Sequence, residues 1–123
     1  MIRGVGLDIV TISRIQRLMD RYGDVFFAKV FTPEECEYCR RAGKRAQHYA
    51  VRFAAKEAAL KALGVPPGVR WHDLEVSNTE EGVPEIRLRG RAAQAAEQRG
   101  VAHLLLSLSH EGDVAAAVVI ADG

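Results

Sequence analysis

The sequence has little cysteine, almost no net charge and no long apolar run. Its two cysteines among 123 residues are too few for a secreted, disulfide-stapled domain. Seventeen Lys and Arg against 16 Asp and Glu leave a net charge of +1, which argues against a general nucleic-acid-binding protein. No apolar run approaches the ~18 residues that span a membrane, and the N-terminus lacks a signal-peptide pattern. We therefore expect a soluble, cytoplasmic protein that binds neither nucleic acid nor membrane.

The length of the chain favours one domain. A protein of 123 residues buries roughly two-thirds of its unfolded surface, enough for one hydrophobic core but not for two. No linker, repeat or low-complexity segment divides the sequence. We expect residues 1–123 to form a single domain.

The first half of the sequence predicts one strand followed by three helices. Residues 4–12 alternate as a strand, with Val5, Leu7 and Ile9 on one face and two glycines and Asp8 on the other. Capping signals then delimit the helices. The expected helices are 14–22 (N-cap Ser13, with Gln16 completing a capping box), 33–41 (Thr32, Pro33 and Glu35) and 47–63 (ending before Gly64).

The second half predicts mostly strands. The expected elements are a strand over 71–78, a turn at 80–82, a strand over 84–88, a short helix over 91–99, and strands over 102–109 and 114–120 joined at Gly112-Asp113. Helices followed mainly by strands favour an α+β fold in which antiparallel strands pack on helices.

Asp8 is the first residue with a chemical implication. A carboxylate within an apolar strand is unfavourable unless it is paired, hydrogen-bonded or bound to a metal. Gly4 and Gly6 leave the same face open to close approach by another group. An aspartate that accepts backbone hydrogen bonds at a strand end is the alternative interpretation.

The helix expected over 47–63 carries charges without a broad polar face. Its apolar stripe contains Lys56 and has Glu57 at its edge, while the opposite side is alanine. A buried helix of this kind needs partners for its charges. Two simpler interpretations remain: Glu57 and Lys61 form an ordinary i,i+4 surface ion pair, and Lys56 extends its ammonium to solvent.

Four segments of the chain resemble the motif blocks of a known family. They are GVGLDIV from Gly4, FTPEE from Phe31, RFAAKEAALKALG from Arg52 and SLSHEGDVAAAVV from Ser107. They are similar to the blocks of the holo-acyl carrier protein synthase family, the short bacterial class of 4′-phosphopantetheinyl transferases. The resemblance covers essentially the whole chain in the right order. It implies the 4′-phosphopantetheinyl transferase fold and a role in fatty acid biosynthesis.

The resemblance also implies a reaction and a metal site. The family transfers the phosphopantetheine arm of coenzyme A to a serine of apo acyl carrier protein and releases adenosine 3′,5′-bisphosphate. Asp8 and Glu57 match the family's Mg²⁺ ligands, and oxygen donors of this kind suit Mg²⁺. Lys61 fits a cation that reaches the pyrophosphate. The serine proton passes to Glu57 or Asp8, directly or through a metal-bound water, and Lys56 contacts substrate or forms a structural pair.

Further residues match the family's coenzyme A contacts. The basic segment 40–45 is by itself an ordinary solvated turn, but by resemblance Arg45 and Arg52 are candidates for binding the 3′-phosphate. Gly82 and Pro84 match a loop beside the adenine, and His110 matches a late motif near the coenzyme A pocket.

The resemblance implies two protein partners. Arg14 matches a basic position that meets the acidic recognition helix of the carrier protein. The family assembles as a homotrimer with active sites between subunits. The nearly continuous apolar strands over 102–109 and 114–120 need burial on both faces, and we expect them to supply much of that contact.

Several other signals are weaker. Cys36-x-x-Cys39 has zinc-like spacing but no second ligand pair, and His48, His72 and His103 are isolated residues that we interpret as structural or exposed. Two functional alternatives remain open: an oligomeric module that binds coenzyme A or nucleotides without catalysis, and a Mg²⁺-dependent pyrophosphate hydrolase.

Overall fold

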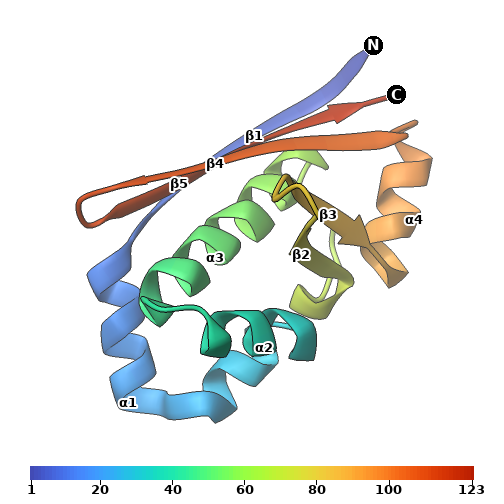
Figure 1. Ribbon diagram of the computed structural model, residues 1–123. Coiled ribbons are helices and arrows are strands. Elements are labelled where there is room, and N and C mark those ends of the chain that lie inside the picture. Colours follow the sequence, from blue (N-terminus) through green and yellow to red (C-terminus); the bar gives the residue numbers. More distant parts are fainter.

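A three-stranded sheet lies along one long helix. The computed structural model describes residues 1–123. The sheet has the order β1 (Ile2–Thr11), β5 (Val114–Asp122), β4 (His103–Glu111), with both neighbouring pairs antiparallel. Helix α3 (Arg45–Ala62) runs beneath it, and Figure 1 shows the helices on one side of the sheet. This arrangement confirms the α+β fold with antiparallel strands packed on helices.

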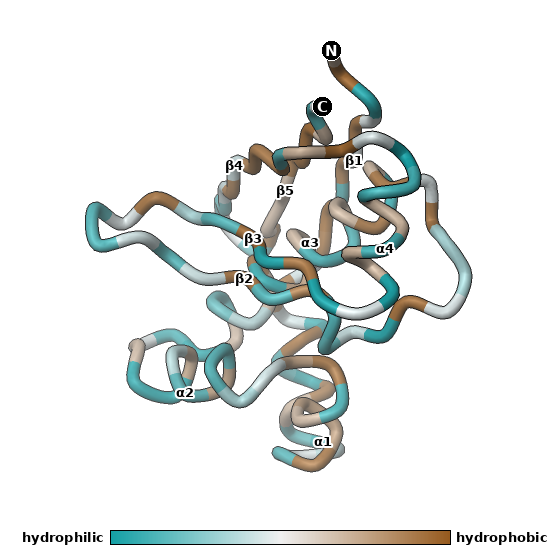
Figure 2. The backbone as a smooth tube through the Cα atoms, turned by 90° about the vertical axis from the view of Figure 1, so that its right-hand side faces the viewer, coloured by the Kyte–Doolittle hydropathy of each residue, from teal (hydrophilic) through white to brown (hydrophobic).

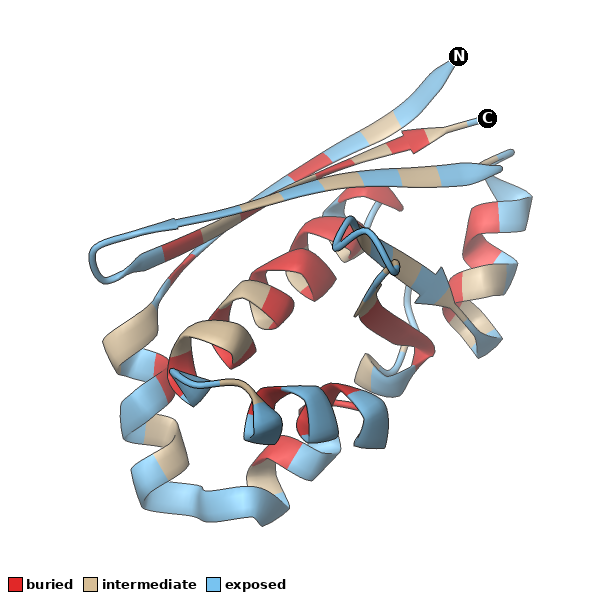
Figure 3. Ribbon diagram, viewed as in Figure 1, coloured by how far each residue is buried: buried red, intermediate tan, exposed pale blue.

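The remaining elements enclose the other sides of α3. They are α1 (Ile12–Val30), α2 (Pro33–Arg41), the 3₁₀ turn η1 (Trp71–Asp73), the hairpin of β2 (Leu74–Asn78) and β3 (Pro84–Leu88), and α4 (Gly90–Gln98). A cluster of 21 buried residues forms the hydrophobic core between these elements and the sheet. Figure 3 shows α3 largely buried, while exposed residues alternate along β1 and β4.

Glycine and alanine allow β1 to approach α3 very closely. A Cβ atom on Gly4 would lie 2.0 Å from the Ala62 carbonyl oxygen, and one on Gly6 only 1.8 Å from that of Ala58. Both alanines are buried. The two glycines therefore serve backbone packing, and they fix the height of β1 over the helix that carries Glu57.

The outer face of the sheet is apolar and exposed. Val5, Leu7 and Ile9 are 59%, 58% and 64% exposed, and Leu105 is 57% exposed. The register aligns Val5 with Ile120 and Ile120 with Leu105 across the three strands. Figure 2 shows hydrophobic residues along β1 and β4. This face has the composition of a contact surface rather than of a solvated one.

The first predicted helix begins two residues too late, and its predicted end at residue 22 falls at a break in the helix. Helix α1 begins at Ile12, leaves the helical conformation at Gly23 (φ 66°, ψ −160°), and resumes as a second helical stretch that ends at Val30. Ser13 does not cap it, because its amide and hydroxyl both donate to Asp113 in the β4–β5 turn. Gln16 bonds to Asp20 instead of closing a capping box. A tertiary partner has replaced the local one.

Other boundaries follow the sequence more closely. The capping box of α2 is present, with Glu35 N–H donating to Thr32 Oγ1 and Thr32 N–H to Glu35 Oε1. The strand expected from Trp71 begins only at Leu74, because the preceding residues form the turn η1. The turn at Gly112-Asp113 joins β4 to β5 as predicted.

Candidate functional site

Asp8, Glu57 and Lys61 meet where β1 crosses α3. Asp8 faces the helix from β1, and its side chain is 17% exposed. Lys61 Nζ donates to the Leu7 carbonyl oxygen at 2.8 Å and lies 3.3 Å from Asp8 Oδ1. The expected alternative, an ion pair between Glu57 and Lys61, does not form, because the ammonium pairs with the strand carboxylate instead.

Glu57 is close enough to Asp8 for the two carboxylates to interact. Burial raises the pKa of Glu57, the charge of Asp8 raises it further, and Lys61 opposes both effects. No group of three or more His, Cys, Asp or Glu side chains surrounds this point. Two hard oxygen ligands fit Mg²⁺, which commonly binds one or two carboxylates and completes its octahedron with phosphate and water.

Lys56, the neighbour of Glu57, is entirely buried. Its Nζ lies 2.6 Å from Glu35 Oε1 and donates to the carbonyl oxygens of Val30 at 2.7 Å and Trp71 at 3.2 Å. Burial lowers the pKa of Lys56 and the Glu35 carboxylate opposes that shift. The solvent-exposed interpretation of Lys56 is wrong. The residue forms a structural pair that ties α3 to the ends of α1 and η1.

Arg52 belongs to a second group on α3. Only 4% of Arg52 is exposed, its Nη2 donates to Asn78 Oδ1 at 3.1 Å, and its guanidinium lies 4.0 Å from the Tyr38 ring centroid. Its buried Nε has no hydrogen-bond partner. Arg45, two turns earlier on the same side of α3, is exposed and lies 3.6 Å from Asp24. A buried guanidinium with an unused donor is suited to an anion.

The β2–β3 hairpin is connected to Arg52 through Asn78. Asn78 is paired with Pro84 across the hairpin, and its Nδ2 donates to the Gly82 carbonyl oxygen at 3.3 Å. Gly82 has a φ of +85°, which an L side chain rarely adopts. No sequence pattern pointed to Asn78 or Tyr38, because both act through contacts with a residue distant in the chain.

His110 approaches α3 from the sheet. It stands at the end of β4, and its Nε2 lies 3.1 Å from Gln47 Nε2 near the start of the helix. Arg52 and Glu57 are five residues apart, which places them about 140° apart around the helix axis. The structure thus joins Asp8, Glu57 and Lys61 in one group and Arg52 with the hairpin in another, on different sides of α3.

Arg14 lies apart from both groups, exposed on α1. It borders an apolar cavity of about 110 Å³ between α1, β1 and α3. The cavity is lined by Val10, Arg14, Ile15, Leu18, Phe26, Phe27, Val30, Phe31 and Phe53. An exposed cation beside an apolar hollow suits a partner with both acidic and apolar side chains.

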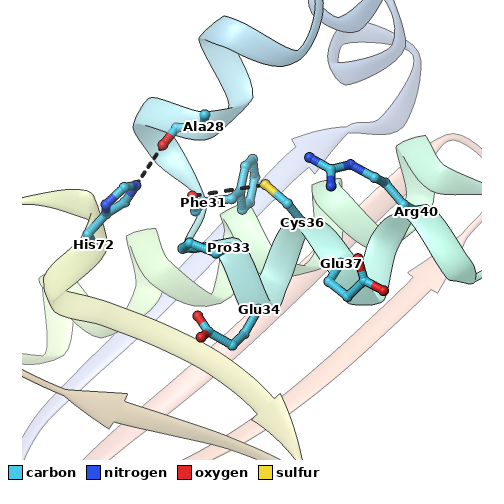
Figure 4. A pocket seen from close by; sticks show the side chains of 8 residues that line it. All are labelled: Ala28, Phe31, Pro33, Glu34, Cys36, Glu37, Arg40 and His72. Atoms are coloured by element: carbon cyan, nitrogen blue, oxygen red, sulfur yellow. Dashed lines mark hydrogen bonds between the residues drawn. The ribbon is translucent and has the colours of Figure 1, made fainter.

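A larger, open pocket of about 540 Å³ contains none of the predicted site residues (Figure 4). It lies between the end of α1, α2 and η1, where His72 Nε2 is 2.7 Å from the Ala28 carbonyl oxygen. Cys36 lines it, but this thiol is buried, and burial raises the pKa of Cys39 to about 12. The Cys39 thiol is therefore unreactive near neutral pH. No helix is both long enough and apolar enough to cross a bilayer.

Comparisons with known proteins identify the family of this chain. A family model described as the 4′-phosphopantetheinyl transferase superfamily matches residues 4–119. The holo-[acyl-carrier-protein] synthase of Anaeromyxobacter dehalogenans (strain 2CP-C) is 51% identical over 126 residues, covering 100% of this chain and 98% of that protein.

Solved structures give the same result. The Neisseria meningitidis holo-[acyl-carrier-protein] synthase superposes with a TM-score of 0.90 at 37% identity and 100% coverage of both chains. The Helicobacter pylori enzyme, solved in complex with coenzyme A, gives 0.83 at 30% identity and covers 96% of this chain and 99% of that one. This chain belongs to the holo-[acyl-carrier-protein] synthase family of the 4′-phosphopantetheinyl transferase superfamily.

Proposed function

We propose that this chain transfers the 4′-phosphopantetheine arm of coenzyme A to a serine of apo acyl carrier protein, with Asp8 and Glu57 holding Mg²⁺. The main evidence for the metal site is that these two carboxylates lie close to each other and to Lys61 where β1 crosses α3. The transfer supplies the carrier for fatty acid biosynthesis. The unpaired cysteines fit the reducing cytoplasm, where we expect the reaction to occur.

The serine hydroxyl attacks the β-phosphorus of the pyrophosphate. The new P–O bond to serine forms as the bond to the bridging oxygen breaks, and adenosine 3′,5′-bisphosphate leaves. When bound, Mg²⁺ neutralises phosphate charge and polarises the phosphoryl oxygens. Lys61 adds positive charge beside the leaving group. Glu57 or Asp8 accepts the serine proton.

Arg45 and Arg52 bind the 3′-phosphate of coenzyme A, and the hairpin around Gly82 and Pro84 lies beside the adenine. Support comes from the unpartnered Nε of Arg52 and from the contact between Asn78 and both Arg52 and Gly82. His110 extends the same region from β4. A phosphate oxygen would satisfy the buried donor, which is unfavourable to leave unpaired.

The active enzyme is a homotrimer with active sites between subunits. The carboxylates and the arginines lie on different sides of α3, so one coenzyme A molecule meets both sets most readily across a boundary between two copies. The exposed apolar face of the sheet, including Val5, Leu7 and Leu105, supplies the contact surface.

The carrier protein docks on α1. Arg14 is followed by Arg17 and Arg21 at i+3 and i+7, which places three exposed arginines on one side of the helix. The apolar cavity beside Arg14 receives an apolar side chain of the partner. Such a surface steers an acidic helix into place and makes the association sensitive to salt.

A single assay tests the reaction. The protein is incubated with apo carrier protein, coenzyme A and Mg²⁺, and the carrier is weighed intact. A mass increase equal to the phosphopantetheine arm supports the transferase. Cleavage of coenzyme A without a change in the carrier would instead indicate a pyrophosphate hydrolase, and binding without turnover would indicate a coenzyme A-binding module.

A further inference from the structure

His48 stands between the two arginines assigned to the phosphate. Arg45, His48 and Arg52 occupy positions i, i+3 and i+7 of α3, so they share one side of the helix. His48 is half-buried. Its ring packs against the Tyr38 ring in a T-shaped arrangement, with centroids 5.6 Å apart, and the Arg52 guanidinium lies over the Tyr38 ring. One aromatic side chain thus holds the imidazole and the guanidinium together.

The surroundings of His48 favour the neutral form of its imidazole. Burial lowers the pKa of His48, and the charge of Arg52 on the same helix and that of His110 on β4 lower it further. Only the carbonyl of Gly43, in the loop before α3, acts in the opposite direction. Tyr38 presents its ring from α2. No carboxylate is among the groups that shift the pKa of His48, so no negative charge of the protein stabilises an imidazolium there.

We propose that His48 is a third ligand of the phosphate held by Arg45 and Arg52 and that it takes up a proton from solvent when this phosphate binds. The proposal rests on the coenzyme A site described above and adds a ligand and a proton to it. An uncharged imidazole among cations is a poor anion ligand until it is protonated, whereas an imidazolium presents two N–H donors.

The phosphate itself supplies the driving force for protonation. A dianion bound by Arg52 offsets the guanidinium charge that disfavours the imidazolium and places negative charge beside the ring, so the pKa of His48 rises on binding. By linkage, a group with a higher pKa in the bound state strengthens binding as pH falls through that pKa, and it adds nothing at pH values above it. The phosphate monoester also titrates near pH ~6, so variants must be compared at the same pH.

Calorimetry measures the proton directly. Coenzyme A is titrated into the protein at neutral pH, with chelator and no added metal, in two buffers of different ionisation enthalpy. We expect the wild-type protein to take up on the order of half a proton. His48→Gln removes most of that uptake and weakens binding about three- to tenfold. His103→Gln, which alters an exposed histidine at the start of β4, leaves both unchanged.

Two further measurements make the proposal falsifiable without relying on one variant. Coenzyme A lacking its 3′-phosphate elicits no uptake at His48. In the wild-type protein, the NMR titration of the His48 ring shifts to higher pH when coenzyme A is bound. Equal uptake by His48→Gln and wild type, equal uptake with the truncated ligand, or an unshifted ring titration would each overturn the proposal. Failure of wild type to bind coenzyme A would instead overturn the proposed function.

Discussion

The Lys61 ammonium connects α3 to the carboxylate of β1, with Nζ 2.8 Å from the Leu7 carbonyl oxygen and 3.3 Å from Asp8 Oδ1. A helix side chain thus holds the strand carboxylate beside Glu57. In the proposed reaction, the same ammonium adds positive charge beside the pyrophosphate. Its loss should therefore affect catalysis more than folding, because Lys61 is half-exposed.

Replacing Lys61 tests this double role. We expect Lys61→Gln to lower kcat/KM for coenzyme A by about tenfold to a hundredfold, because a charge that stabilises the transition state is lost. Lys29→Gln, a matched change at an exposed lysine on α1, should leave it unchanged. Steady-state kinetics at fixed Mg²⁺ gives the ratio, and equal values for both variants would contradict the assignment.

The close approach of β1 to α3 predicts a strong effect of one methyl group. In Gly6→Ala the new Cβ would meet the Ala58 carbonyl oxygen, so β1 must move away from the helix. We expect a loss of about 1–3 kcal/mol or more in the free energy of unfolding, measured with urea. Gly43→Ala has open space around the new Cβ and should be tolerated. Equal stability of the two variants would argue against this packing.

The buried pair of Glu35 and Lys56 predicts a pattern of stabilities. Glu35→Gln leaves the Lys56 ammonium buried without its counter-charge, and we expect it to cost about 3–5 kcal/mol. Replacing both residues, as in Glu35→Gln with Lys56→Met, removes the uncompensated charge and should recover part of that loss. Denaturant unfolding of the two single variants and the double variant supplies the coupling energy. Strict additivity would contradict the pairing.

Arg14 predicts a separation of the two substrates. We expect Arg14→Glu to raise KM for the carrier protein by about tenfold or more at low salt while leaving KM for coenzyme A unchanged. Arg99→Glu provides the matched charge reversal at the exposed arginine that follows α4. Figure 1 shows α1 and α4 at opposite ends of the molecule. If Arg14→Glu instead raised KM for coenzyme A, Arg14 would belong to the nucleotide site.

Local patterns predicted much of the fold, and tertiary contacts explain the errors. The capping box at Thr32 and Glu35 is a local signal, and it holds. Ser13 carries the same kind of signal, but Asp113, a hundred residues away, binds its amide and hydroxyl. The predicted end of the first helix coincides with the break at Gly23, and the unpredicted stretch beyond it is helical with Phe27 and Val30 buried in the core.

The candidate site likewise has residues that local sequence motifs predicted and contacts that only the tertiary structure shows. Asp8, Glu57 and Lys61 could be named from sequence motifs, but the pairing of Lys61 with Asp8 could not, since it depends on the distance between β1 and α3. Lys56 has the same charge as Lys61 but lies buried against Glu35, a partner that no spacing along the helix indicates. Asn78 is assigned to the site only because it contacts Arg52.

The most direct test of the account is the intact mass of the carrier protein after reaction with variants of the two carboxylates. We predict that Asp8→Asn and Glu57→Gln each slow the Mg²⁺-dependent mass increase by on the order of 10²-fold or more while remaining folded. Glu37→Gln, which alters an exposed glutamate paired with Arg41, should react like the wild type. Wild-type rates in both carboxylate variants would contradict a metal site formed by Asp8 and Glu57.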